Sequence, residues 1–161
     1  MFSVLTLLSV FCEIFAAGIL IAGSYTFAKK YFETKDKQFL SLFFIFSLFS
    51  MYVTGVVASQ IMFDIDIPIK TLIITQKLIY SFLILAAFFV WIFFFQKTGR
   101  FVRSGMYLAS AISVILLYLN FFSAINLVFR LDIIEPAIES AAILPIRYFW
   151  ALSWLALSMY F

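Results

Sequence analysis

The chain has 161 residues, of which 66% are hydrophobic and only 12% are charged, with a formal net charge of +3. A soluble domain is typically about 45–50% apolar and about 25% charged, so a globule of this length could not bury so much apolar surface away from water. The apolar stretches are continuous and lack the strict polar alternation of barrel strands, which leaves an all-α integral membrane bundle. The basic residues lie in short connections beside these stretches, where they set membrane topology, and nucleic acid is not an expected partner.

A helix needs about 20 apolar residues to cross the roughly 30 Å hydrocarbon core of a bilayer. Five stretches approach or exceed this length, and together they form one transmembrane domain over residues 1–161. We expect the five spans at residues 2–28, 39–63, 72–95, 106–129 and 145–161.

Glu13 lies in the first span, which holds no other charged residue. A carboxyl group inside a bilayer is costly, so it usually faces protein or water and has a partner. Counting 1.5 Å per residue places it roughly 15 Å below the outer surface, at a depth similar to that of Tyr52, Tyr80, Tyr118 and Asn120. Two interpretations remain open: a proton or cation relay, or a protonated carboxyl group hydrogen-bonded to a tyrosine or to the helix of a partner subunit.

Small residues recur at four-residue spacing in three of the expected spans. This spacing lets helix backbones approach closely within a membrane. The predicted helix-packing positions are Gly18, Ala22, Gly55, Ser59, Gly105, Ala109 and Ser113.

The connections between spans alternate in charge. "KKYFETKDKQ" and "QKTGRFVRSG" are basic, whereas the other two connections hold an outer acidic cluster of Asp64, Asp66, Asp132, Glu135 and Glu139. The bias of basic residues predicts an outer N-terminus and a cytoplasmic C-terminus. We expect no metal at this cluster, because the neighbouring carboxylates of "DIDIP" supply fewer oxygens than the six to eight that calcium takes.

The stretch 130–144 precedes the fifth span. Its acidic residues are three and four apart and would share one face of a helix, with apolar residues on the other. This pattern predicts a short amphipathic helix on the outer membrane surface, ended by Pro145. The alternative is a longer, kinked span over 136–161.

The composition also argues against catalysis. The chain has no histidine and one cysteine, Cys12, which excludes the usual histidine-ligated haem, imidazole acid–base chemistry and thiolate metal sites. No Gly-rich phosphate loop occurs. We therefore expect neither enzymatic activity nor a cofactor.

Two segments, "KDKQFLSLFFIFSLFSMYVTGVVASQ" and "QKLIYSFLILAAFFVWIFFFQKTGR", share a polar start, an aromatic-rich span and a Gln–Lys-led span that ends in a Thr–Gly turn. In this pattern they resemble the N-terminal seven-transmembrane sensor regions of some histidine kinases. The resemblance implies a sensory or signalling module, although five rather than seven spans are expected here and the 161 residues hold no expected kinase domain.

The predicted function is that of a non-catalytic subunit that packs against and stabilises a larger membrane protein complex. Its expected partners are membrane lipids and other integral membrane subunits, in a cell membrane or an energy-transducing inner membrane. The alternatives are the sensory module and a small carboxylate-dependent transporter that uses Glu13.

Overall fold

The computed structural model describes residues 4–64, 67–99, 102–123, 125–129, 136–140 and 142–158. Five helices and one strand pair make up this part of the chain. They are α1 (Val4–Thr34), α2 (Lys37–Asp64), α3 (Ile69–Thr98), α4 (Val102–Phe122), β1 (Ile125–Phe129), β2 (Pro136–Ser140) and α5 (Ile143–Ser158).

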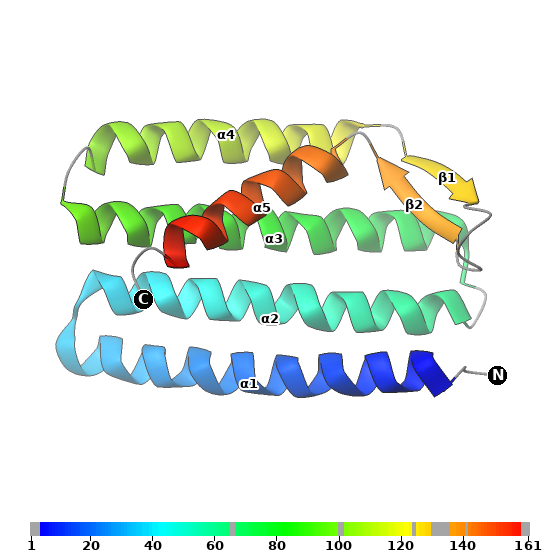
Figure 1. The fold of residues 1–161 in the computed structure, drawn as a ribbon, viewed down its shortest axis with the longest axis horizontal. Coiled ribbons are helices and arrows are strands. Elements are labelled where there is room, and N and C mark those ends of the chain that lie inside the picture. Colours follow the sequence, from blue (N-terminus) through cyan, green and yellow to red (C-terminus); the bar gives the residue numbers. More distant parts are fainter. Residues whose placement is uncertain are drawn as a thin grey trace.

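The four long helices run antiparallel in a row that follows the chain order, and α5 crosses obliquely over α3 (Figure 1). α3 therefore packs against three helices, α2, α4 and α5, whereas α1 packs mainly against α2. The side chains of Ile84, Ala86 and Ala87 in α3 are completely buried. Of the four long helices, α1 is the least buried within the bundle.

Local chemistry explains where the long helices stop. Lys35 has a positive φ of 57°, which ends α1, and the Asp36 carboxylate accepts a hydrogen bond from the Gln38 backbone N–H at the start of α2. Pro68 precedes α3 with an extended ψ of 131°. Gly99 ends α3 in the left-handed region, at φ 62°, and its N–H donates to the carbonyl of Phe95.

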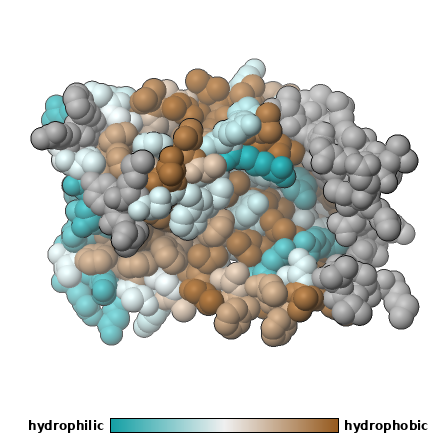
Figure 2. Space-filling model, in the orientation of Figure 1, coloured by the Kyte–Doolittle hydropathy of each residue, from teal (hydrophilic) through white to brown (hydrophobic). Residues whose placement is uncertain are grey.

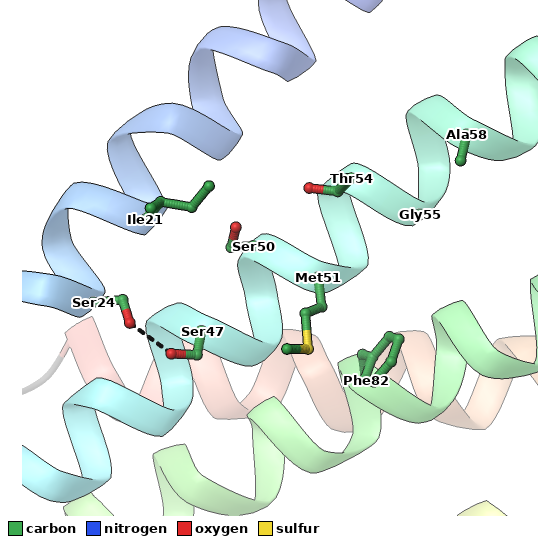
Figure 3. Close-up of a pocket in the computed structure, with 9 residues that line it drawn as sticks. All are labelled: Ile21, Ser24, Ser47, Ser50, Met51, Thr54, Gly55, Ala58 and Phe82. Atoms are coloured by element: carbon green, nitrogen blue, oxygen red, sulfur yellow. Dashed lines mark hydrogen bonds between the residues drawn. The ribbon is translucent and has the colours of Figure 1, made fainter. Parts of the chain in front are cut away.

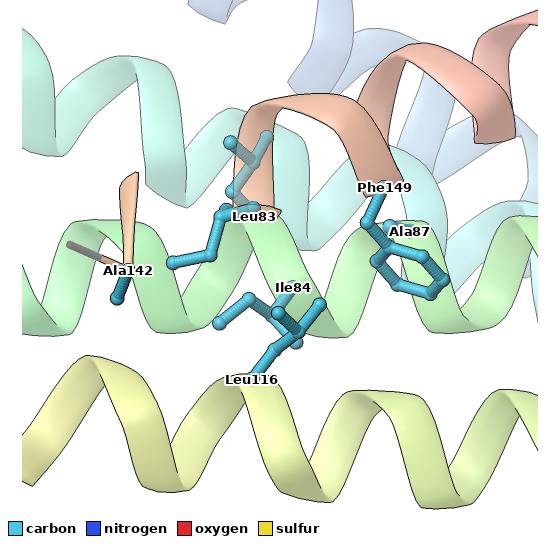
Figure 4. Close-up of a cluster of buried hydrophobic side chains, with 7 residues drawn as sticks. Leu83, Ile84, Ala87, Leu116, Ala142 and Phe149 are labelled. Atoms are coloured by element: carbon cyan, nitrogen blue, oxygen red, sulfur yellow. The ribbon is translucent and has the colours of Figure 1, made fainter. Parts of the chain in front are cut away.

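One buried cluster joins three of the helices (Figure 4). Leu83, Ile84 and Ala87 of α3 meet Leu116 of α4 and three residues at and near the start of α5, which are Ala142, Ile146 and Phe149. Lipid tails are as apolar as leucine, so close van der Waals packing holds such a cluster together within a membrane. The cluster fixes α5 across α3.

Four of the described helices, α1 to α4, are long and apolar enough to cross a membrane, whereas α5 is a shorter apolar helix of 16 residues. Figure 2 shows mostly hydrophobic side chains over the middle of one face, interrupted by two hydrophilic groups, with further hydrophilic ones towards the end that carries the α1–α2 connection. These features indicate a multi-pass membrane protein. The α1–α2 and α3–α4 connections share one end of the row, and the α2–α3 connection and the hairpin lie at the other (Figure 1). The orientation across the membrane stays a prediction.

The region after α4 differs from the sequence prediction. The helix expected to run to residue 129 ends at Phe122, and residues 125–129 pair antiparallel with 136–140, from Ile125 opposite Ser140 to Phe129 opposite Pro136. The amphipathic helix over 130–144 and the alternative helix from residue 136 are therefore both wrong for residues 136–140, while residues 130–135 lie outside the described part.

Residue preferences explain this hairpin. "INLVF" is rich in β-branched and aromatic residues, which favour strands, and a proline such as Pro136 is tolerated at the first position of a strand. Pro145 falls in the first turn of α5, where its missing N–H costs no helical hydrogen bond.

Candidate intramembrane polar site

Glu13 sits on the side of α1 that faces α2 and is half-buried. Its Oε1 accepts a hydrogen bond from the Ser9 hydroxyl at 3.2 Å and another from Nε2 of Gln60, on α2, at 3.3 Å. Its Oε2 is buried and has no hydrogen-bond partner among the described residues, and the same is true of the Gln60 Oε1. The α1–α2 contact thus contains two neighbouring polar groups, each with one unsatisfied oxygen.

Helix geometry brings these two side chains together. Side chains on an α-helix tilt toward its N-terminus. Because α1 and α2 are antiparallel, Glu13 and Gln60 tilt toward each other along the seam. Polar contacts continue from there to α3, because Nε2 of Gln76 donates to the hydroxyl of Ser59 at 3.2 Å.

The tyrosines expected at the depth of Glu13 occupy different surroundings. Tyr52 is half-buried on α2 and interacts electrostatically with Tyr80 of α3, Arg147 of α5 and Glu13. Tyr118 is 61% exposed and stacks on a neighbouring ring of α4, so it lies on an outward face of the bundle. The hydrogen bonds that Glu13 makes with described residues go to a serine and a glutamine.

Asn120 forms a second polar contact, between α4 and α3. It is 3% exposed, and its Nδ2 donates to the carbonyl of Lys77 at 2.7 Å and to the hydroxyl of Ser81 at 3.1 Å. The Lys77 ammonium group in turn donates to the carbonyl of Phe121 at 2.6 Å. A cation placed at the C-terminal end of α4 stabilises the carbonyls exposed there. Asn120 of α4 thus bonds to α3, and Lys77 of α3 bonds to α4.

The small residues divide into an inner and an outer set. Gly55 lies against Ile79 and Gly105 against Phe95, so both face α3. The other inner positions, which are buried, are Ser59, Ala109 and Ser113. Gly18 and Ala22 are exposed on α1, and a Cβ added at Gly18 would meet no atom within 4 Å.

A groove of about 590 Å³ lies between α1 and α2 (Figure 3). Its wall carries four hydroxyl groups, and those of Ser24 and Ser47 are joined by a hydrogen bond of 2.6 Å. Ser50 and Thr54 line the space between the two helices, and Phe82 of α3 lies at its edge. The lining is otherwise apolar, so the groove suits a lipid chain better than an ion.

The outer acidic cluster lies outside the described side chains. This holds for Asp64, Asp66, Asp132, Glu135 and Glu139, although the backbones of Asp64 and Glu139 are placed in α2 and β2. Among the residues whose placement is described, no group of three acidic, cysteine or histidine side chains could hold a metal ion.

Searches with the whole chain found no matching protein-family model, no matching curated protein and no matching solved structure. The arguments for function therefore rest on the geometry of the bundle.

Proposed function

We propose that this chain is a non-catalytic integral membrane subunit, in a cell membrane or an energy-transducing inner membrane, that packs against a larger membrane protein and stabilises it. The outer face of α1 is the docking surface, defined by Phe11, Gly18, Ala22 and Tyr25. The observation that carries the proposal is the exposure of Gly18 and Ala22 on a helix that has one principal neighbour.

The inner glycines show that small residues allow close approach of helices in this bundle. Gly55 and Gly105 lie directly beneath side chains of α3, and the helices approach closely there. Gly18 and Ala22 have the same spacing and are both exposed, and a Cβ added at Gly18 would meet no described atom within 4 Å. Phe11 and Tyr25, which are 69% and 72% exposed, flank them with large rings. A shallow strip between bulky residues accepts a ridge of another helix, and such packing drives association in lipid.

The docking surface can be tested by cross-linking in native membranes. In a Cys12→Ser background, a single cysteine at Gly18 or Ala22 should cross-link to a defined partner. A cysteine at Ile115, which is 57% exposed on α4, is the control and should not.

A bulky substitution at the docking surface provides a second test of the proposal. Gly18→Leu should abolish the cross-link formed at Ala22 without lowering the thermal stability of the chain, because the new side chain meets no intramolecular atom near its Cβ. The matched control is Val114→Leu on the exposed face of α4. Equal cross-linking from both faces, or an unchanged cross-link in Gly18→Leu, would contradict the proposal.

A second candidate function is a small carboxylate-dependent transporter, which the unpaired, buried Oε2 of Glu13 favours. In that case Glu13→Gln should abolish ion flux into vesicles while the fold persists, because the substitution removes only ionisation. The subunit function predicts no flux that depends on Glu13.

A further inference from the structure

The unsatisfied oxygens of Glu13 and Gln60 belong to two groups that already touch. Gln60 Nε2 donates to Glu13 Oε1, while Glu13 Oε2 and Gln60 Oε1 are both buried and find no hydrogen-bond partner in the part of the chain that the structure describes. A buried acceptor without a donor is costly in hydrocarbon, where no water can replace the missing donor. An ionised Glu13 would leave two such acceptors on the same seam and add an uncompensated charge.

One proton satisfies both oxygens. We propose that Glu13 and Gln60 form a buried proton-binding site, in which a neutral Glu13 carboxyl group and the Gln60 amide pair through two antiparallel hydrogen bonds. Glu13 Oε2–H donates to Gln60 Oε1, and Gln60 Nε2–H donates to Glu13 Oε1. The acid and the amide are complementary in this state, since each supplies one donor and one acceptor.

A metal ion fits these two oxygens less well. Hard cations take about six oxygen ligands, and the contact between Glu13 and Gln60 leaves only one oxygen of each described side chain unpaired. Rotating the Gln60 amide by half a turn, which exchanges its oxygen and nitrogen, does not satisfy an ionised Glu13 either. The amide oxygen would then face Oε1 of the carboxylate. A proton needs only one donor atom and one acceptor atom.

The neighbouring charges act on this site from a distance. Tyr52, on α2, interacts electrostatically with Glu13, with Tyr80 of α3 and with Arg147 of α5. Arg147 is exposed, and the hydrogen bonds of Glu13 with described residues go to Ser9 and Gln60. The Gln60 N–H donation to Oε1 suits either state of the carboxyl group, whereas the unpaired Gln60 Oε1 beside it needs a donor.

Loss of the proton would act on the packing of α1. The α1–α2 contact is the main attachment of α1 to the bundle. A carboxylate at this contact would repel the Gln60 oxygen and draw water into the seam. The proton therefore acts as a ligand of the packed state, and raising the pH should shift the population toward a looser α1. This inference does not depend on the docking surface proposed above.

Infrared difference spectroscopy of the full chain in lipid bilayers tests the protonation directly. At neutral pH, the spectrum of wild type minus Glu13→Gln should contain the carbonyl band of a protonated carboxylic acid. The matched control, wild type minus Glu33→Gln, should contain only carboxylate bands, because Glu33 is exposed near the other end of α1. Carboxylate bands in the Glu13 difference spectrum would overturn the proposal.

Two further measurements test the partner and the consequence. Gln60→Leu should shift the protonated-acid band, because the hydrogen bond to the amide oxygen is lost, and an unshifted band would exclude the pair. In a Cys12→Ser background, spin labels at Phe11 and Ile61 should report a longer or broader distance distribution at high pH. Glu13→Gln should abolish this change, since two amides form the same pair of bonds at every pH. A pH response that survives in Glu13→Gln would overturn the coupling of the proton to α1.

Discussion

Replacing Gly55 with alanine should destabilise the contact between α2 and α3. The added Cβ would lie 2.6 Å from Cγ1 of Ile79 and 3.3 Å from its Cδ1. Carbon atoms pack at about 3.5–4.0 Å, so the nearer pair would overlap by about 1 Å. Ile79 is 2% exposed and β-branched, which leaves its side chain one strongly preferred rotamer in a helix and no free space to enter. The helices themselves must separate.

Two opposing terms set the magnitude. Overpacking of this kind costs about 1–3 kcal/mol, whereas exchanging a helical glycine for alanine contributes about 1 kcal/mol of helix propensity. Gly18→Ala is the matched control, because its Cβ meets nothing within 4 Å and only the propensity term applies. The difference in unfolding free energy between the two variants should therefore equal the overpacking term, about 1–3 kcal/mol.

The assay is equilibrium unfolding of both variants in mixed micelles with increasing denaturing detergent. Helix content and a second probe of tertiary packing should give the same midpoint. Gly55→Ala should unfold at a lower detergent fraction than Gly18→Ala. Equal midpoints would show that Ile79 relaxes at no cost, and would refute the argument from its burial.

Two further predictions concern the α3–α4 contact and the topology. Asn120→Leu should lower the unfolding free energy by about 0.5–2 kcal/mol, the range of interhelical hydrogen bonds in membranes. Lys77→Met should free the C-terminal end of α4, because the hydrogen bond to the Phe121 carbonyl is lost. Unchanged stability in both variants would contradict the hydrogen bonds described. In sealed vesicles, cysteines placed at Lys35 and Arg100 should react from one side and a cysteine at Asp66 from the other, and reaction of all three from one side would contradict the predicted crossings.

The long helices were predictable because lipid leaves the chain few choices. The expected spans 39–63 and 72–95 fall within α2 and α3, and the described part of the span 2–28 falls within α1. The helices extend past the apolar segments, since a helix ends at a backbone signal rather than where hydropathy falls. α1 continues through "KKYFET" until Lys35 takes a positive φ.

The region after Phe122 was not predictable from periodicity alone. Three acids at helical spacing in 130–144 are equally compatible with a turn and a short strand, because a few polar residues fix no period. Residues 125–129 favour a strand, but they are also hydrophobic, so the prediction assigned them to the fourth span. Pairing between 125–129 and 136–140 is a tertiary feature, and only the partner strand shows it.

The hydrogen-bond partner of Glu13 shows the limit of counting residues along a helix. The rise per residue gives the depth of a side chain but not the direction in which it points. Depth favoured Tyr52 and Tyr80, yet Gln60 is the α2 residue whose amide reaches the carboxyl group. In the sequence, the polar residue Gln60 within the apolar segment "VVASQIMF" indicated that a polar contact forms here. The direction of its side chain required the antiparallel arrangement of α1 and α2.

The two proposals concern different sides of one helix and can fail separately. Glu13 and Gly18 are five residues apart, and at 3.6 residues per turn this separates them by about 140° around α1. Glu13 faces α2, whereas Gly18 faces away from every described helix. Glu13→Gln keeps the contact with α2 and should leave cross-linking at the docking surface intact, while Gly18→Leu should remove the cross-link and leave the protonated-acid band unchanged. A loss of both signals in either variant would mean that α1 packs differently from the arrangement described.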